Sequence, residues 1–183
     1  VLSSPQAFVY DAQADKIIFL KGEESVVYPA STTKLATALF ALTVLERDVL
    51  VTPGDELSLL SPASSIAYIK PWHTLSVEML VEAMLIPSGN DAAYALAAAA
   101  GQRLGGASGI SAVDVFMDAM NTYTASIGLC GTHFTVPDGL DGTRHYTTLE
   151  DMVIISNLAY ENELISKYAA MPSDDVVYAS GHI

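Results

Sequence analysis

The spacing of apolar residues changes along the chain, and it predicts a short β-hairpin followed by a mainly helical region. Residues 7–10 and 16–20 are rich in β-branched and aromatic residues, and the polar segment 11–15 between them suits a hairpin loop. From residue 31 to about residue 46 the apolar residues recur at helical spacing instead. This segment is predicted to be the first helix.

Four more helices are predicted from helical apolar spacing and from residues that favour helix ends. They cover approximately residues 76–85, 90–101, 112–127 and 148–160. Ser76 is expected to cap the first of these helices, and either Asn90 or Asp91 the second. Thr148 followed by Asp151 resembles a capping box at the start of the last helix.

The remaining segments are predicted to be strands or connections. Short strands are expected at residues 56–60 and from 176–178, whereas residues 62–71 fit no single class. Residues 101–109 are rich in glycine but have neither a preceding strand nor a phosphate-loop lysine, so we interpret them as a linker. Residues 132–141 are expected to be extended and rich in turns.

The composition is that of a globular protein, and it excludes some partners. The 183 residues suit a single module, and 51% of them are hydrophobic, which is enough for a core. The net charge of −13 comes without the Lys and Arg clusters that bind phosphate backbones, so no nucleic-acid partner is expected. The sequence has no membrane-spanning apolar run and no signal-peptide pattern, so we interpret the chain as a mature or trimmed form.

The cysteine and the histidines give no indication of a metal site. Cys130 is the only cysteine, so an internal disulfide is excluded, and we expect its thiol to be buried and unreactive. His73, His133, His145 and His182 lack ligand spacing, and we expect each to lie on the surface or to be hydrogen-bonded. No metal or cofactor is expected.

The first candidate for chemistry lies where the first helix begins. Ser31 and Lys34 are three positions apart, so one helical turn places the hydroxyl and the amine on one face, at the positive end of the helix dipole. The amine can take the proton of the hydroxyl, and free backbone N–H groups can stabilise the anion. The ordinary alternative is a capping serine beside a solvated lysine, and 17 serines with 5 lysines produce such a pair readily by chance.

The second candidate is the turn Ser88-Gly89-Asn90, between two predicted helices. Such a loop can present a hydroxyl and an amide side chain to a cleft. The alternative is helix punctuation, in which Pro87 ends one helix, Gly89 turns the chain and Asn90 caps the next helix. Neither short motif is specific alone, but both belong to a longer ordered series.

Taken together, the motifs resemble the penicillin-binding protein and serine β-lactamase superfamily, and more closely its low-molecular-mass D-alanyl-D-alanine carboxypeptidases. The similar stretches run in order from about residue 7 to about residue 160. They include 9–11 (VYD), 28–34 (YPASTTK), 85–93 (LIPSGNDAA), 128–134 (GLCGTHF), 137–141 (PDGLD), 145–148 (HYTT) and 151–152 (DM). The resemblance implies an α+β fold in which a helical region, about residues 60–165, packs on an antiparallel sheet.

The resemblance also implies acyl transfer on peptidoglycan stem peptides that end in D-Ala-D-Ala, with β-lactam antibiotics as covalent inhibitors and an extracytoplasmic location. Ser31 is expected to be the nucleophile. Lys34 is expected to be its base, with a pKa lowered by burial and by the helix N-terminus. Ser88 is expected to relay a proton to the leaving amine, and Asn90 to hydrogen-bond Lys34 and the substrate amide.

One motif of the family does not occur in this sequence. None of the five lysines begins a Lys-Thr-Gly or Lys-Ser-Gly motif, which in the family lies on a strand beyond the point where this chain ends. We therefore interpret the chain as an N-terminal piece of the catalytic module that lacks the C-terminal sheet strands, and expect it alone to be inactive or weak. The hairpin should then keep an open edge and an uncovered apolar face, to be covered by self-association or by the missing segment.

The sequence leaves two other functions open. A β-lactamase or esterase on the same fold needs a base that positions water, and Glu78 and Glu82 precede Ser88 on a predicted helix. The ordinary interpretation of these two glutamates is a solvated helix face, and nothing in the sequence points to a deacylating glutamate. A non-catalytic penicillin-binding sensor would instead form a stable acyl adduct without turnover.

Overall fold

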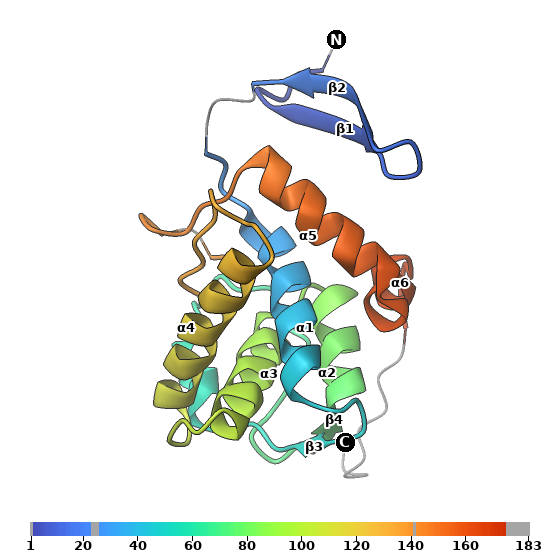
Figure 1. Ribbon diagram of the computed structural model, residues 1–183. Coiled ribbons are helices and arrows are strands. Elements are labelled where there is room, and N and C mark those ends of the chain that lie inside the picture. Colours follow the sequence, from blue (N-terminus) through green and yellow to red (C-terminus); the bar gives the residue numbers. More distant parts are fainter. Residues whose placement is uncertain (1, 23–25, 141, 175–183) are drawn as a thin grey trace.

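The computed structural model describes residues 2–22, 26–140 and 142–174 (Figure 1). In chain order its elements are β1 (Ala7–Asp11), β2 (Lys16–Lys21), the 3₁₀ turn η1 (Ala30–Thr32), α1 (Thr33–Val44), β3 (Leu50–Val51), the 3₁₀ turn η2 (Asp55–Leu59), β4 (Leu75–Ser76), α2 (Val77–Leu85), α3 (Asn90–Arg103), α4 (Ile110–Ser126), α5 (Leu149–Glu161) and α6 (Glu163–Ala169). The α+β class expected from the sequence is confirmed.

The predicted β-hairpin is present at one end of the molecule (Figure 1). Strands β1 and β2 pair antiparallel, and in the described residues they form a sheet of two strands only. Strand β1 contacts helix α5, whereas Ile17, Ile18 and Phe19 of β2 are 50%, 62% and 42% exposed. The hairpin therefore carries the uncovered apolar surface that the sequence led us to expect.

Helices α1, α2 and α4 all pack against helix α3 in the helical region (Figure 1). Nearly all of its side chains are buried, and most of them are alanine. Because alanine has a short side chain, neighbouring helices can approach this one closely and pack densely against it. The alanine-rich segment is thus the core of the helical region.

The predicted helix starts are confirmed in two places and wrong in one. Ser76 Oγ accepts a hydrogen bond from Met79 N at 3.2 Å, and Thr148 Oγ1 accepts one from Asp151 N at 3.1 Å. Neither Asn90 nor Asp91 caps α3, because Asn90 is already helical and the cap position is Gly89. The Asp91 carboxylate is instead held by backbone N–H groups of the segment before β4.

The strand predicted at residues 56–60 is wrong, because this segment forms the 3₁₀ turn η2. Ser58 Oγ donates to the carbonyl of Asp55 at 2.6 Å, and the Glu56 carboxylate accepts the N–H of Gly54 at 2.7 Å. These local hydrogen bonds curl the backbone, which an extended strand could not do. The strand predicted from residues 176–178 lies outside the described residues.

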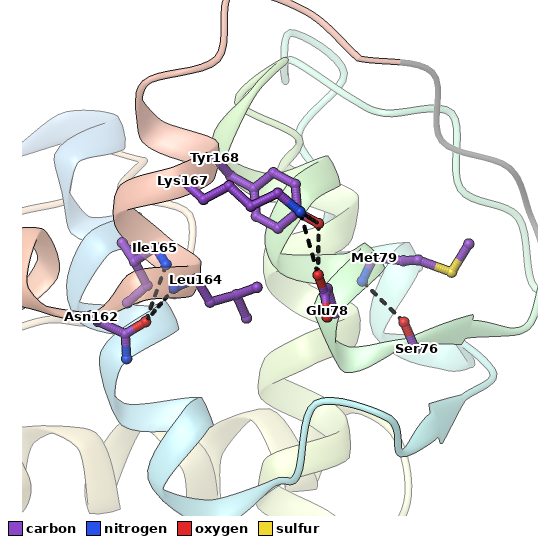
Figure 2. Close-up of polar contacts among 8 residues, drawn as sticks. All are labelled: Ser76, Glu78, Met79, Asn162, Leu164, Ile165, Lys167 and Tyr168. Atoms are coloured by element: carbon purple, nitrogen blue, oxygen red, sulfur yellow. Dashed lines mark hydrogen bonds and ion pairs between the residues drawn. The ribbon is translucent and has the colours of Figure 1, made fainter.

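The short helix α6 packs across α2 and was not predicted. Figure 2 shows its start, where Asn162 Oδ1 accepts the N–H groups of Leu164 and Ile165, each at 3.1 Å. Figure 2 also shows its contact with α2, where Tyr168 Oη donates to Glu78 at 3.0 Å. Lys167 lies 3.6 Å from the same carboxylate.

The interpretation of Glu78 and Glu82 as a solvated helix face is therefore wrong for Glu82. This side chain is only 9% exposed, because the segment that contains α6 covers it. It lines a cavity of about 420 Å³ together with Asp174 and the apolar residues Ile66 and Ile86. Burial, and then the nearby carboxylate of Asp174, raise the pKa of Glu82 above its ordinary value.

A Glu82→Gln substitution tests this burial. Because the pKa of Glu82 is higher in the folded state than in the unfolded state, wild-type stability should fall relative to the variant as the pH rises from about 4.5 through the raised pKa. Urea unfolding of both proteins between pH 4 and pH 8 measures this difference. The control is Glu161→Gln at an exposed position, and two parallel pH curves for wild type and Glu82→Gln would contradict the assignment.

Candidate functional site

Ser31 lies in the 3₁₀ turn η1, directly before helix α1, and Lys34 lies in the first turn of that helix. The turn is closed by a hydrogen bond from Thr32 N to the carbonyl of Pro29 at 3.1 Å. This geometry directs both side chains the same way, and Lys34 Nζ is 3.1 Å from Ser31 Oγ. The spacing seen in the sequence thus becomes a direct contact between the hydroxyl and the amine.

Lys34 is buried although it carries an ionisable amine. Its side chain is 1% exposed, while the residue Ser31 at its tip is exposed. Burial lowers the pKa of Lys34 below its ordinary value, and the carboxylate of Asp138 opposes the shift only in part. Since removing an ammonium from water disfavours the charged form, the lysine is biased toward the neutral amine that can accept a proton.

A loop from a distant part of the sequence holds Lys34 in place. We call residues 135–140 and 142–145 the Asp138 loop. Lys34 Nζ donates to the carbonyl of Asp138 at 2.8 Å, and one turn further along α1, Thr37 Oγ1 donates to the carbonyl of Pro137 at 2.7 Å. The amine is therefore fixed between the hydroxyl of Ser31 and a backbone carbonyl from the loop.

The Asp138 loop approaches the turn η1 so closely that only glycine fits at its tip. Gly139 has φ +85°, and a Cβ atom there would lie 1.8 Å from the carbonyl oxygen of Ala30 and 3.0 Å from Thr33 Oγ1. The residue opposite, Ala30, itself has φ +48°, which is uncommon for a residue with a side chain. This close approach brings the loop against the backbone that carries Ser31.

The turn between α2 and α3 carries Ser88 and Asn90. Its backbone is pinned at two points, with Gly89 N donating to the carbonyl of Ala83 at 3.2 Å and Asn90 N to that of Ser65 at 2.8 Å. A Cβ at Gly89 would lie 2.5 Å from the carbonyl of Ala83, so a glycine is required here for space. Ser88 has φ +59°, so its side chain leaves the helical path.

Two cavities meet at Ser31, and between them they contain all four residues expected from the sequence. One, of about 280 Å³, is lined by Ser31, Lys34 and Ser88 with apolar side chains that include Leu35 and Met84. The other, of about 310 Å³, is lined on its polar side by Ser31, Ser64, Ser65, Asn90 and Asp138. The structure thus places Ser88 and Asn90 of the second motif in the two cavities that share Ser31.

The sequence did not predict the role of some residues of this site. Asp138 and Gly139 belong to a stretch that carried the family resemblance, but their contacts with α1 could not be read from it. Asp91, 1% exposed, accepts hydrogen bonds from the N–H groups of Ala67 and Ile69, both at 2.8 Å, and so holds the segment that contains Ser64 and Ser65. In the sequence, its place directly after Ser88-Gly89-Asn90 was the only signal of this role.

The other candidate residues do not line these two cavities. Cys130 is exposed, so the expectation of a buried thiol is wrong: the apolar neighbour Leu129 enters the core in its place. His73, His133 and His145 are hydrogen-bonded, as expected, and His182 lies outside the described residues. Within the described ranges, no group of three or more His, Cys, Asp or Glu residues could hold a metal ion.

Comparison with known proteins identifies the family. The sequence profile of the Peptidase_S11 family, D-alanyl-D-alanine carboxypeptidase, matches residues 2–182. The D-alanyl-D-alanine carboxypeptidase DacB2 of Mycobacterium tuberculosis is 31% identical over 167 residues, which cover 90% of this chain and 53% of the relative. DacA of Escherichia coli is 33% identical over 137 residues, covering 69% of this chain and 32% of the relative.

Solved structures agree with the sequence matches. The crystal structure of the Streptomyces K15 DD-transpeptidase superposes with a TM-score of 0.80 at 26% identity, covering 92% of this chain and 64% of that one. The D-alanyl-D-alanine carboxypeptidase DacD of Francisella tularensis gives a TM-score of 0.77 at 30% identity, with 92% and 40% covered.

The fold is that of the D-alanyl-D-alanine carboxypeptidases and DD-transpeptidases among these solved structures. Within that class, the chain belongs to the peptidase S11 family of D-alanyl-D-alanine carboxypeptidases. It spans about half the length of the M. tuberculosis relative and about a third of the E. coli one. Among the described residues, no helix is long and apolar enough to cross a membrane.

A Gly139→Ala substitution tests the close approach of the Asp138 loop to Ala30. The new methyl group would meet a backbone carbonyl, so the loop or the turn η1 must move, and stability should fall by roughly 2–4 kcal/mol. The matched control is Gly105→Ala, where φ is also positive (+104°) but nothing lies within 4 Å.

The control separates the two causes of the loss. Gly105→Ala should lower the free energy of unfolding only by the cost of the left-handed backbone, about 1–2 kcal/mol. The difference between the two variants therefore measures the steric conflict at Gly139. Urea unfolding provides both values. Equal losses in the two variants would show that the Asp138 loop is not held tightly against η1.

Proposed function

We propose that this chain provides the acylating half of the site of a serine-type D-Ala-D-Ala carboxypeptidase, which acts on peptidoglycan stem peptides and binds penicillins covalently. The observation that carries the proposal is the 3.1 Å contact between Ser31 Oγ and the buried amine of Lys34. The membership of the chain in the carboxypeptidase family supports it. The location implied for such an enzyme is extracytoplasmic, where peptidoglycan is exposed.

Ser31 is the proposed nucleophile and Lys34 its general base. Ser31 Oγ attacks the carbonyl carbon between the two terminal D-alanines while the neutral amine of Lys34 takes the hydroxyl proton. The C–N bond then breaks, D-alanine leaves with a proton on its nitrogen, and an ester links the shortened peptide to Ser31. Water hydrolyses this ester in the second half of the reaction and restores the free hydroxyl.

Ser88 and Asn90 are proposed to act on either side of Ser31. Ser88 lines the same cavity as Lys34, which suits a hydroxyl that passes a proton from Lys34 to the leaving amine. Within the described residues, no hydrogen bond joins Ser88 to Ser31 or Lys34, so this relay would close only around a bound substrate. Asn90 lines the opposite cavity, where its amide can hydrogen-bond the substrate peptide.

The Lys-Thr-Gly motif of the family does not occur in this sequence, and the lack of this motif affects the activity we expect of these residues. In the family its strand supplies the second oxyanion donor and the cation that attracts the substrate's terminal carboxylate. Losing one oxyanion donor costs about 3–4 kcal/mol of transition-state stabilisation in known enzymes. We therefore propose that these 183 residues alone are weak or inactive, and that a partner segment or a second copy would also cover the exposed face of β2.

Labelling with penicillin tests the nucleophile. The full protein, as its gene encodes it, is incubated with a fluorescent penicillin, and the labelled peptide is mapped by mass spectrometry. We expect one label on Ser31 and none in Ser31→Ala, with Ser126→Ala as the control because Ser126 is exposed at the end of α4. Labelling that persists in Ser31→Ala would overturn the assignment.

The fate of the adduct separates the alternatives. Release of D-alanine from a D-Ala-D-Ala peptide supports the carboxypeptidase. A stable adduct without D-alanine release would indicate a sensor, and rapid loss of the adduct would indicate a β-lactamase. The structure does not favour the β-lactamase alternative, since Glu82 lines a cavity that does not contain Ser31.

The pH dependence of acylation tests Lys34 as the base. Because the base must be unprotonated, the acylation rate should rise with pH and reach its plateau below the ordinary lysine pKa of 10.5. Lys34→Arg should lose about a hundredfold or more in acylation rate, since a guanidinium stays protonated. Lys70→Arg at an exposed position is the control, and a Lys34→Arg protein that acylates at the wild-type rate would exclude the role.

A further inference from the structure

One buried ionisable side chain next to the site has no part in the proposed reaction. His145 is 0% exposed and lies at the end of the Asp138 loop. Its ring contacts both the loop and helix α1: Nδ1 lies 3.1 Å from the backbone N of Thr135, and Nε2 lies 2.9 Å from Thr33 Oγ1. The ring of Phe134 packs against it with centroids 5.5 Å apart.

These two contacts determine the tautomer of His145. A backbone N–H can only donate, so Nδ1 must accept and carries no proton. The ring proton of the neutral imidazole is then on Nε2, which donates to Thr33 Oγ1. His145 thus uses one nitrogen to close the base of the Asp138 loop and the other to bind that loop to α1.

Thr33 is the residue between the nucleophile's turn and Lys34. It begins α1, is 0% exposed, and its Oγ1 also faces the tip of the Asp138 loop at Gly139. Three side chains of α1 therefore hold this single loop, at Thr33, Lys34 and Thr37. The bond at Thr33 is the one nearest Ser31 in sequence, and it is made with His145.

We propose that His145 is a positioning residue: through Thr33 and Thr135 it fixes the carbonyl of Asp138 against Lys34 Nζ, and so sets the distance between the amine and Ser31 Oγ. The inference rests on the proposed acyl transfer for its kinetic consequence, but its structural consequence at Lys34 does not. Without the two hydrogen bonds of His145, water reaches the amine of Lys34 and the carbonyl of Asp138 shifts. A displacement of about 1 Å at such a site can cost a hundredfold in rate.

Two pairs of variants separate the two contacts. In His145→Asn the amide oxygen can still accept from Thr135 but cannot reach Thr33, whereas in His145→Gln the amide nitrogen can donate to Thr33. Thr33→Val removes the hydroxyl and Thr33→Ser keeps it. His133→Gln is the control, because His133 also hydrogen-bonds the backbone, through the carbonyl of Arg144 at 2.7 Å, but within the described residues its side chain makes no hydrogen bond to α1.

The first measurement is the rate of penicillin acylation per folded molecule in the full protein, as its gene encodes it. We expect roughly a tenfold to hundredfold loss in His145→Asn and Thr33→Val, and a smaller loss in His145→Gln and Thr33→Ser. The double variant Thr33→Val/His145→Asn should be no slower than either single one, because both remove the same bond. Additive losses, or wild-type rates in destabilised variants, would mean that His145 only stabilises the fold.

The second measurement does not need activity. With five lysines in the sequence, Lys34 can be titrated by NMR after labelling the lysine side chains. Burial lowers its pKa, so loosening the loop in Thr33→Val should move that pKa back up toward 10.5, while His133→Gln leaves it unchanged. If wild-type protein is not acylated at Ser31, the proposed function fails and this titration decides alone: an unchanged Lys34 pKa in Thr33→Val overturns the inference.

Discussion

The burial of one amine determines the rest of this site. Lys34 is 1% exposed, and an ammonium in that place is costly unless it is hydrogen-bonded. Its two hydrogen-bond partners, Ser31 Oγ and the carbonyl of Asp138, come from positions 3 and 104 residues away in sequence. The turn η1, the Asp138 loop and the close packing at Gly139 can all be understood as the means of supplying these two partners while excluding water.

The surrounding backbone is strained where it serves this purpose. Ala30 and Ser88, one on each side of the site, both have positive φ angles although neither is glycine. Such conformations cost about 1–3 kcal/mol each and persist only when packing enforces them. Here the enforcing contacts are identified: the tip of the Asp138 loop presses on Ala30, and two backbone hydrogen bonds at Gly89 and Asn90 hold the turn that carries Ser88.

Sequence reasoning was successful where the signal was local. The hairpin, the helix at Ser31 and the caps at Ser76 and Thr148 depend on spacing and on side chains within a few residues, and all are present. The short contact between Ser31 and Lys34 follows from the same kind of signal, since one helical turn separates the two residues.

Several failures involve partners distant in sequence. Glu82 looks like a surface residue in its own helix, but α6, some 80 residues later, covers it. Asp91 looks like a helix cap, but the N–H groups of Ala67 and Ile69 satisfy its carboxylate. Nothing in the spacing of Thr33 and His145 indicates their contact across 112 positions. Such pairings are fixed by tertiary packing, which no local pattern encodes.

The long separation in sequence between Lys34 and the Asp138 loop has a consequence during synthesis of the protein. At about 5–20 residues per second, a ribosome needs roughly 6–22 seconds to extend the chain from Lys34 to His145. During that interval the amine has no loop to bury it, so Lys34 stays hydrated and its pKa is not lowered by burial. The buried environment of Lys34 therefore forms only when the Asp138 loop has been synthesised and has folded onto α1.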